Sequence, residues 1–413
     1  PDIITTDMLP RDESVIKTSA GEDAYEVYKY KLKFGYHYQV ARNCLQLNRY
    51  ITDSLLTFSD VAPLAGVEAT DWSWSPLMAD FDNDGLKDLF VSNGIVRRPN
   101  DLDYINFISN QAIQDSLQTI ESSDLNILNT MPDGKVSNFV FKNVDGIHFK
   151  DVSTEWGVNT PSFSNGSAYA DLDNDGDLDV VVNNINQPAF VYQNNTRSQS
   201  IRISLIGSKP NSFGIGAKVL TYTGTDFQSC EVSATRGFSS SSDTRIIVGL
   251  GNSVKADSIL IVWPKGTFQK LNSVEAGKTI SAKQSDAKER FDYQRLLPSK
   301  RMVEPLPKSS VPNFVHQEDD YNSFNNEGLI PHMLTTQGPP LAQGDVDGDA
   351  LTDIFVGGGK DQSASIFIQT KQGGWIEKRN KDFFSDSFTE DIAAEFIDVD
   401  GDHDLDLLVA AGG

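Results

Sequence analysis

The stretch Asp80–Asp88, with the sequence DFDNDGLKD, has aspartate at its first, third, fifth and ninth positions. Three further stretches repeat this pattern in full: DLDNDGDLD from Asp171, DVDGDALTD from Asp345 and DVDGDHDLD from Asp398. Each motif is followed by a short apolar run, such as Leu89–Val91, which is typical of a buried β-strand. The repeated unit is therefore an acidic loop that leads into a strand.

The spacing of the motifs indicates where other segments are inserted. The last two begin at Asp345 and Asp398, 53 residues apart, and we take this interval as the length of one repeat. The other gaps are longer, and the middle gap leaves room for a separate small domain. A repeat of about 50 residues made of short strands is typical of a β-propeller blade, whereas a β-helix has a shorter repeat.

Apolar segments near the motifs predict further strands. Phe139–Asn143, followed by Asp145-Gly146, predicts a hairpin because Asp-Gly favours tight turns. Tyr38–Asn43 has a similar pattern, and Ala189–Asn194 and Ile366–Gln369 follow later motifs in the same way. We therefore expect each blade to contain at least one more strand after the acidic loop.

The first four residues, Pro1-Asp2-Ile3-Ile4, align with the end of a fifth motif copy, at Lys87–Phe90. The chain thus begins within one repeat and ends soon after another, so we expect it to be part of a longer protein. Since a leader would then lie outside this sequence, the lack of a signal segment does not indicate a cytoplasmic protein.

Two segments depart from the strand pattern. Apolar residues recur at helical spacing from Asp101 to about residue 128, with Asp101 or Asp103 placed to cap the helix. Residues 22–34 fit either a strand or a helix, and we favour a helix that ends at Gly35. We expect helical insertions at 5–35 and 97–132, on loops between strands.

The spacing of the aspartates predicts metal binding. Four carboxylates within one short turn repel each other and raise each other's pKa unless a cation lies between them. A hard divalent ion turns the same arrangement into an all-oxygen cage, and calcium accepts irregular oxygen geometry more readily than magnesium. The loop resembles the start of an EF-hand, but it lacks the glutamate at the twelfth position and leads into a strand.

About four calcium sites are therefore expected, one in each loop. The predicted ligands are the four aspartates of each motif and the backbone carbonyl of the residue at its seventh position. They are Asp80, Asp82, Asp84, Leu86 and Asp88; Asp171, Asp173, Asp175, Asp177 and Asp179; Asp345, Asp347, Asp349, Leu351 and Asp353; and Asp398, Asp400, Asp402, Asp404 and Asp406.

The third loop is expected to bind calcium most weakly. The first two loops have glycine at the sixth position, Gly85 and Gly176, where the turn favours a left-handed backbone. The third and fourth loops have Ala350 and His403 there, with glycine moved to the fourth position. A left-handed backbone at alanine is unfavourable by about 1 kcal/mol, and this energy opposes formation of the calcium site.

The charge of the chain excludes some partners. Its 35 Lys+Arg and 58 Asp+Glu residues give a net charge of −23, which disfavours nucleic acids and anionic membrane surfaces. No apolar run reaches the roughly 18 residues that cross a bilayer. Short calcium loops typically bind at roughly 10⁻⁴ to 10⁻³ M, which matches extracellular rather than cytosolic calcium.

At these motifs the sequence resembles the FG-GAP/VCBS repeat family, whose acidic loops bind calcium in β-propellers. The resemblance covers roughly residues 1–199 and 286–413. Residues 200–285 resemble the ASPIC/UnbV domain, as in cartilage acidic protein and bacterial surface proteins; the stretches that carry this likeness are Gly214–Val219, Arg236–Asp243 and Ile259–Pro264. Alternating apolar residues and glycine-rich turns independently predict a small β-sandwich there.

The expected fold class is all-β: β-propeller blades with calcium loops, an inserted β-sandwich-like domain and short helical insertions. The expected domains are blades with helical insertions at 1–199, the ASPIC/UnbV-like sandwich at 200–285 and further blades at 286–413. The last segment either completes the first propeller or begins a second one, and we favour the second.

The resemblance implies adhesion, partner binding or scaffolding. We expect a bacterial protein that is extracellular or at the cell surface, secreted or anchored to the outer membrane as a lipoprotein. Its partners would be surface proteins, for example an outer-membrane nutrient transporter complex. The alternative is calcium-dependent glycan binding or an accessory role in polysaccharide processing, with Trp72, Trp74, Tyr36 and Tyr38 as candidate contacts.

Motifs of common enzymes are absent from the sequence. None of its five histidines lies in HExxH, and it has neither a GxSxG elbow nor a phosphate-binding GxxxxGK[ST] loop. Cys44 and Cys230 form no zinc pattern, and two free thiols are expected. We therefore expect a binding protein and not an enzyme.

Overall fold

The computed structural model describes residues 2–21, 24–37, 39–49, 57–110, 129–293, 310–327, 330, 333 and 338–412. The chain divides into two compact units, Pro1–Tyr293 and Gln294–Gly413. Strands make up 38% and helices 11% of the structure, so the all-β expectation is confirmed at this level. The sheets within the described ranges do not close into a ring, and the propeller and the three-domain division stay predictions.

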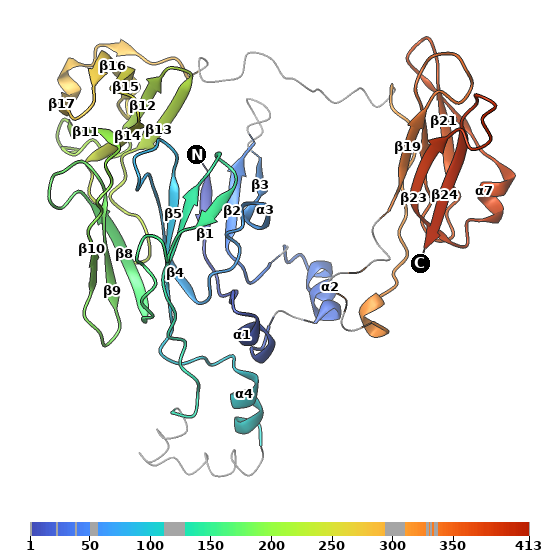
Figure 1. Cartoon of the computed structure of the whole chain (residues 1–413), viewed down its shortest axis with the longest axis horizontal. Coiled ribbons are helices and arrows are strands. Elements are labelled where there is room, and N and C mark those ends of the chain that lie inside the picture. Colours follow the sequence, from blue (N-terminus) through green and yellow to red (C-terminus); the bar gives the residue numbers. More distant parts are fainter. Residues whose placement is uncertain are drawn as a thin grey trace. The chain divides into compact units, whose positions relative to one another are not determined.

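Three small antiparallel sheets make up much of the first unit, and each consists of strands that follow one another along the chain (Figure 1). The strands of the three sheets are β1 (Ile3–Thr5), β2 (Cys44–Asn48) and β3 (Phe58–Asp60); β4 (Ser73–Ala79), β5 (Asp88–Asn93), β6 (Phe139–Asn143) and β7 (Phe149–Asp151); and β8 (Ser164–Ala170), β9 (Asp179–Asn184) and β10 (Phe190–Tyr192). The hairpin predicted after Phe139 is confirmed by the pairing of β6 with β7, and β10 confirms the strand predicted at Ala189–Asn194.

The sheet β4–β7 is buried on both faces. Leu89 and Val91 of β5 pack with residues of the first sheet, whereas Phe90 packs with Val180 and Val182 of β9. Successive side chains of a strand point to opposite faces, so one run of apolar residues can supply two cores. This explains why the apolar run after the first acidic loop is continuous and not alternating.

The strand predicted at Tyr38–Asn43 is wrong, because the strand at this place is β2, Cys44–Asn48. Tyr38 lies outside the described residues, and residues 39–43 have no strand pairing. Asn43 is buried instead, and its side-chain amide donates hydrogen bonds to the carbonyl of Val67 and the hydroxyl of Thr70. Long-range pairing of β2 with β1 sets the register, which the local pattern did not show.

A β-sandwich follows the third sheet, as the alternating pattern predicted. One sheet has the order β14-β11-β17 and the other β13-β12-β15-β16-β18, and both contribute to one apolar core that includes Ile203, Ile261 and Trp263. The strands are β11 (Gln199–Ile206), β12 (Lys218–Thr223), β13 (Asp226–Glu231), β14 (Ile246–Gly251), β15 (Lys255–Val262), β16 (Thr267–Glu275), β17 (Thr279–Lys283) and β18 (Glu289–Arg290). A 3₁₀ turn, Gln284–Asp286, precedes β18.

Short helices interrupt the first unit. They are α1 (Glu13–Thr18), α2 (Tyr25–Lys33), α3 (Ala62–Ala65) and α4 (Leu102–Ile108). The helix favoured for residues 22–34 is confirmed by α2, which precedes a left-handed Gly35. Asp101 caps α4, because its carboxylate accepts a hydrogen bond from the backbone of Tyr104. The predicted continuation of this helix over residues 111–128 lies outside the described residues.

The second unit contains two further antiparallel sheets. Their strands are β19 (Leu341–Gly344), β20 (Asp353–Val356), β21 (Ser365–Gln369) and β22 (Trp375–Lys378), and β23 (Glu390–Ile397) with β24 (Asp406–Gly412). The strand β21 confirms the prediction at Ile366–Gln369. A short 3₁₀ turn, Ser323–Asn325, and the helix α7, Lys381–Ser385, complete the unit.

Candidate metal centres

Each acidic motif forms the turn between two neighbouring antiparallel strands. The four loops connect β4 to β5, β8 to β9, β19 to β20 and β23 to β24. In each loop three aspartates have carboxylate oxygens within 4.8 Å of one another, a spacing that allows joint binding of one ion. These triads are Asp80, Asp82 and Asp88; Asp171, Asp173 and Asp175; Asp345, Asp347 and Asp353; and Asp398, Asp400 and Asp406.

The ninth aspartate of the motif also fastens the loop to its sheet. In the first loop one carboxylate oxygen of Asp88 accepts a hydrogen bond from the backbone of Phe81 at 3.0 Å. The other accepts from Asn143 on β6 at 2.9 Å. Asp179 and Asp353 make the same pair of contacts in their own loops. This aspartate therefore joins the acidic loop, the start of its own strand and the end of the next strand.

Asp2 makes the second of these contacts as well. Its carboxylate accepts a hydrogen bond from the backbone of Asn48 at 2.9 Å, and β1 follows it directly. Asp2 thus stands where the ninth aspartate of a motif would stand, in agreement with its alignment to Asp88.

Two backbone positions in every loop are left-handed. At the sixth position φ is 100° for Gly85 and 67° for Ala350. The expectation that Ala350 carries an unfavourable conformation is therefore confirmed, while its effect on calcium affinity stays a prediction. The fourth position is also left-handed, with φ of 57° at Asn83 and 77° at Gly348, and the sequence reasoning missed this requirement. The signal was present, because asparagine and glycine are the residues that tolerate this conformation best.

The sandwich covers the first loop and the buried part of the second, whereas residues 172–175 of the second loop are exposed. The backbone of Gly251 donates to the carbonyl of Asn83 at 2.7 Å, and a side chain on Gly249 would collide with Asp80 and Asn83. The second loop receives a hydrogen bond from Ser200 to the carbonyl of Gly176 at 2.6 Å. The sandwich therefore holds both loops in place.

Burial leaves carboxylate oxygens of these two loops without donors. Asp80 is 1% exposed and Asp171 is 2% exposed. One oxygen of Asp80 and both oxygens of Asp171 are buried and accept no hydrogen bond. Buried anionic oxygens without partners are unfavourable, and a bound cation would satisfy them.

Burial also raises the pKa of three acids in these two loops, Asp80, Asp88 and Asp177. It raises the pKa of Asp80 and of Asp88 to about 7, and the nearby Asp82 charge adds to the effect. Burial, together with the charge of Asp175, raises the pKa of Asp177 to about 7. These three carboxyls therefore resist ionisation unless positive charge is supplied.

The residues fit a hard cation such as calcium. The triads consist entirely of oxygen donors, which calcium prefers, and contain neither cysteine nor histidine. When bound, calcium would supply positive charge to the turn and hold the two strands that it connects. The four triads are consistent with the predicted number of sites.

Only some of the predicted ligands of each loop lie close enough together to bind one ion. The fifth-position residues Asp84, Asp349 and Asp402 lie outside the triads of their loops. In the second loop the fifth-position Asp175 belongs to the triad, and the ninth-position Asp179 lies outside it. At the seventh position Asp177 is buried at 2% exposure and its carboxylate accepts from the backbone of Thr196. Asp404, at the seventh position of the fourth loop, is exposed. The proposed carbonyl ligands at this position stay predictions.

A cation from β6 reaches the first loop, which the sequence reasoning missed. The ammonium of Lys142 forms ion pairs with a carboxylate oxygen of Asp82 and, at 2.9 Å, with one of Asp84. Partial burial lowers the pKa of Lys142, but its hydrogen bonds to the two aspartates outweigh this and raise the pKa above the usual range. Lys142 therefore remains charged and offsets part of the negative charge of the loop.

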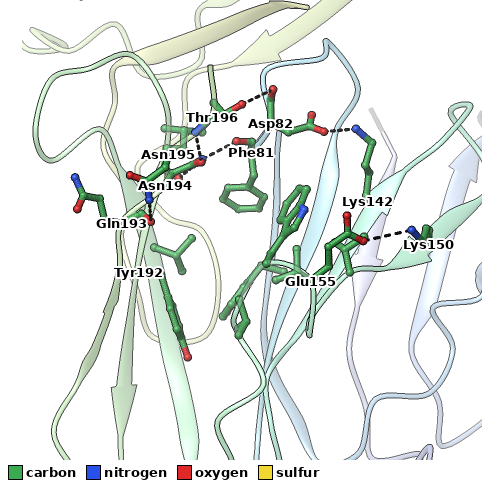
Figure 2. A pocket seen from close by; sticks show the side chains of 17 residues that line it. Phe81, Asp82, Lys142, Lys150, Glu155, Tyr192, Gln193, Asn194, Asn195 and Thr196 are labelled. Carbon is green, nitrogen blue, oxygen red and sulfur yellow. Dashed lines mark hydrogen bonds and ion pairs between the residues drawn. The ribbon is translucent and has the colours of Figure 1, made fainter. Parts of the chain in front are cut away.

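A cavity of about 540 Å³ lies beside the first loop, between the second and third sheets (Figure 2). Its apolar lining includes Phe90 and Trp156, and polar lining comes from Lys142, Lys150 and Gln193. A cavity of this size and composition is typical of small-ligand sites.

The aromatic residues proposed for glycan binding are not all available. The indole of Trp74 donates a hydrogen bond to the carbonyl of Gly94 at 2.8 Å, and its ring packs on Phe238 of the sandwich segment. Tyr36 is 56% exposed and Trp72 is half-buried, and their role stays a prediction. Tyr38 lies outside the described residues.

Other sequence predictions can be compared directly. Cys44 and Cys230 are free, as expected. The side chain of His403 is 95% exposed, as expected, and its Nδ1 lies 3.8 Å from a carboxylate oxygen of Asp398. Within the described ranges no helix has the length and apolar character needed to cross a membrane.

Two parts of the chain match known protein families. Residues 207–289 match the family described as ASPIC and UnbV, and they coincide with most of the sandwich. Residues 345–409 match the FG-GAP-like repeat and include the third and fourth loops. The chain therefore contains an ASPIC/UnbV domain and an FG-GAP-like repeat, as the resemblance predicted. No curated protein matches the chain.

Proposed function

We propose that this chain is a calcium-binding β-propeller-type protein of the cell exterior that acts as a protein-binding or scaffold module. The observation that carries the proposal is the set of buried, unpaired carboxylate oxygens on Asp80 and Asp171. Each of these two aspartates belongs to a triad of aspartates, and such a triad is present in all four loops. The chain itself supplies too little positive charge to these oxygens, and extracellular calcium is abundant enough to fill sites of this affinity class.

Propeller blades are supported by the way the small sheets stack. Sheets of three or four antiparallel strands share apolar layers on both faces of β5, which is how adjacent blades pack. Calcium at the turns would stiffen each blade and reduce repulsion within a chain of net charge −23.

The helical insertions are the proposed partner contacts. Tyr30 and Phe34 of the α2 region are 62% and 64% exposed, and Phe107 of α4 is 41% exposed. Large apolar side chains on exposed segments are typical of interaction surfaces. A surface protein, such as an outer-membrane nutrient transporter complex, is the partner class we propose for a bacterial protein that is secreted or lipid-anchored.

Calorimetry of the full chain with calcium and with magnesium tests the calcium assignment. We expect heat from calcium binding in the affinity range of short loops, loss of that heat in Asp80→Asn with Asp171→Asn, and a higher melting temperature with calcium than with chelator. Exposed Glu13→Gln on α1 is the control and should behave like the original chain. Equal melting temperatures with calcium and chelator would refute the proposal.

A matched excision tests the partner contacts. Ile95 and Gly134 pair through backbone hydrogen bonds of 3.1 and 2.9 Å, so the ends of the α4 insertion are adjacent. Replacing residues 102–130 by a short Gly/Ser linker should leave calcium binding unchanged and abolish cross-linking to a surface protein of the native cell. Unchanged cross-linking would exclude this insertion as the contact.

Glycan binding is the second candidate, and the cavity beside the first loop favours it. Trp156 and Tyr192 provide aromatic walls, and Gln193 and Asn195 provide amides. A glycan array with calcium and with chelator distinguishes the two functions, since only the glycan-binding role predicts calcium-dependent retention. We assign no reaction to the chain, and turnover of any member of a polysaccharide panel would overturn that assignment.

A further inference from the structure

The first loop differs from the others in the side chain that approaches it from the third strand of its sheet. In each sheet one residue directly precedes the backbone amide that bonds the ninth aspartate. This residue is Lys142 in the first loop, Gln193 in the second and Ile368 in the third. The same position therefore holds a lysine that contacts the first loop, a glutamine that contacts the second and an isoleucine in the third sheet.

Lys142 occupies carboxylate oxygens that a metal ion would need. Its ammonium contacts Asp82, a member of the first triad, and lies 2.9 Å from a carboxylate oxygen of Asp84. The side chain of Lys142 is 34% exposed, so the ion pairs are only partly screened by water. Burial raises the pKa of Asp80, and the charge of Lys87 offsets only part of that rise; among the described residues, the ion pairs of the triad come from Lys142.

The second loop has a weaker substitute. The side-chain amide of Gln193 donates to a carboxylate oxygen of Asp173 at 2.8 Å and carries no charge. Two arginines, Arg202 and Arg245, donate to the carbonyl or amide oxygens of Asn174 or to the carbonyl of Asp171, and not to the triad carboxylates. The nearest guanidinium nitrogen of Arg202 lies 4.0 Å from the Asp171 carboxylate, beyond hydrogen-bond distance. Both oxygens of Asp171 remain without donors, whereas one oxygen of Asp80 accepts a hydrogen bond from the backbone of Gly85 at 2.9 Å.

We propose that Lys142 is a built-in counter-cation of the first loop that calcium must displace, and that its ammonium then moves into the adjoining cavity. The inference rests on the proposed calcium binding and goes beyond it, since it assigns the first loop a lower calcium affinity than that loop would have without Lys142. A carboxylate oxygen that binds calcium cannot hold an ammonium in the same place, because the two cations repel each other.

The cavity gives the displaced ammonium a destination. Lys142 already contributes to its lining, together with Lys150 (Figure 2). Trp156 also lines the cavity. Lys150 is engaged by Glu155 at 3.4 Å, so it does not offset the loop charge. An ammonium that moves toward Trp156 changes the electrostatic environment of the indole, which makes the exchange visible in tryptophan fluorescence.

The test isolates the first loop within the full chain. D173N, D347N and D400N each remove a third-position carboxylate from the other loops, and this triple variant is the background for calorimetry. In it, Lys142→Met should bind calcium about tenfold more tightly, as expected for loss of a competing, partly buried ion pair. Lys142→Gln, which copies the second loop, should give an intermediate affinity, and Lys150→Met should leave it unchanged.

Two further readouts separate the exchange from a general structural effect. Lys142→Met should lower the melting temperature in chelator, because the first loop loses the ion pairs of Lys142 with Asp82 and Asp84. Calcium should nevertheless raise the melting temperature of this variant more than that of the original chain. Calcium should change the fluorescence of the original chain, and either Lys142→Met or Trp156→Phe should remove most of that change.

The outcomes distinguish this inference from the proposed function. If the original chain binds calcium but Lys142→Met leaves the first-loop affinity unchanged or weaker, the exchange is refuted and calcium binding stands. If the fluorescence change persists in Lys142→Met, movement of the ammonium into the cavity is refuted. If no loop binds calcium, the proposed function itself fails.

Discussion

Metal-free protein should lose stability as the pH rises from about 4 to about 7, and calcium should reverse this trend. Burial raises the pKa of Asp80 and of Asp88 from the usual 3.8 to about 7. In the unfolded chain these carboxyls release their protons near pH 4, whereas in the folded chain they retain them until about pH 7. The folded state thus binds more protons within this window, so its free energy of unfolding falls as the protons are removed.

The expected magnitude is large for a single loop. One carboxyl whose pKa rises from 3.8 to about 7 lowers the free energy of unfolding by about 4 kcal/mol once it is ionised. Asp80 and Asp88 belong to one triad, so their joint effect is smaller than the sum of the two. A loss of this size is a considerable part of the total stability of a typical domain, about 5–15 kcal/mol.

Urea unfolding of the full chain at about pH 5 and about pH 8, in chelator and in calcium, measures the effect. Asp80→Asn preserves the shape of the side chain and removes one titrating group, so it should reduce the pH dependence in chelator. Glu13→Gln, which alters a carboxylate that is 78% exposed on α1, should leave that dependence unchanged. Metal-free protein that is equally stable or more stable at the higher pH would refute the reasoning.

Three other substitutions test separate parts of the structure. Asp71→Asn should lower the free energy of unfolding by about 3–5 kcal/mol, because Arg98 donates to both oxygens of Asp71 at 2.8 Å in a buried ion pair. In urea titrations, adding Arg98→Met to this variant should restore part of the lost stability. Gly249→Ala should weaken calcium binding at the first loop in calorimetry, since its new methyl group collides with that loop, whereas Gly21→Ala, in open space, should not. Ala350→Gly should stabilise the second unit by up to about 1 kcal/mol in thermal unfolding, because the φ of 67° is left-handed; an unchanged or lower melting temperature would contradict this.

The acidic loops were the most predictable part of the molecule, because their contacts are local. The carboxylate of Asp82 accepts from the backbone of Asp84, and that of Asp84 from Leu86, within a single turn. Such contacts join residues two positions apart, so the order of residue types nearly specifies the turn. Strand positions were less predictable, and β2 lies several residues beyond the segment predicted for it because it must pair with β1.

The spacing of acids and apolar residues alone established repeated carboxylate turns that lead into buried strands. Tertiary structure alone decided which residues contact these turns. The side-chain amide of Asn83 donates to the carbonyl of Gly176 in the next loop, and Lys142 of β6 forms an ion pair with Asp84. Those contacts join residues far apart in the chain, and they form only after sheets have stacked to bury their apolar faces. Local residue order specifies a turn through short-range hydrogen bonds, but the burial and counter-charge of that turn depend on the packing of the whole unit.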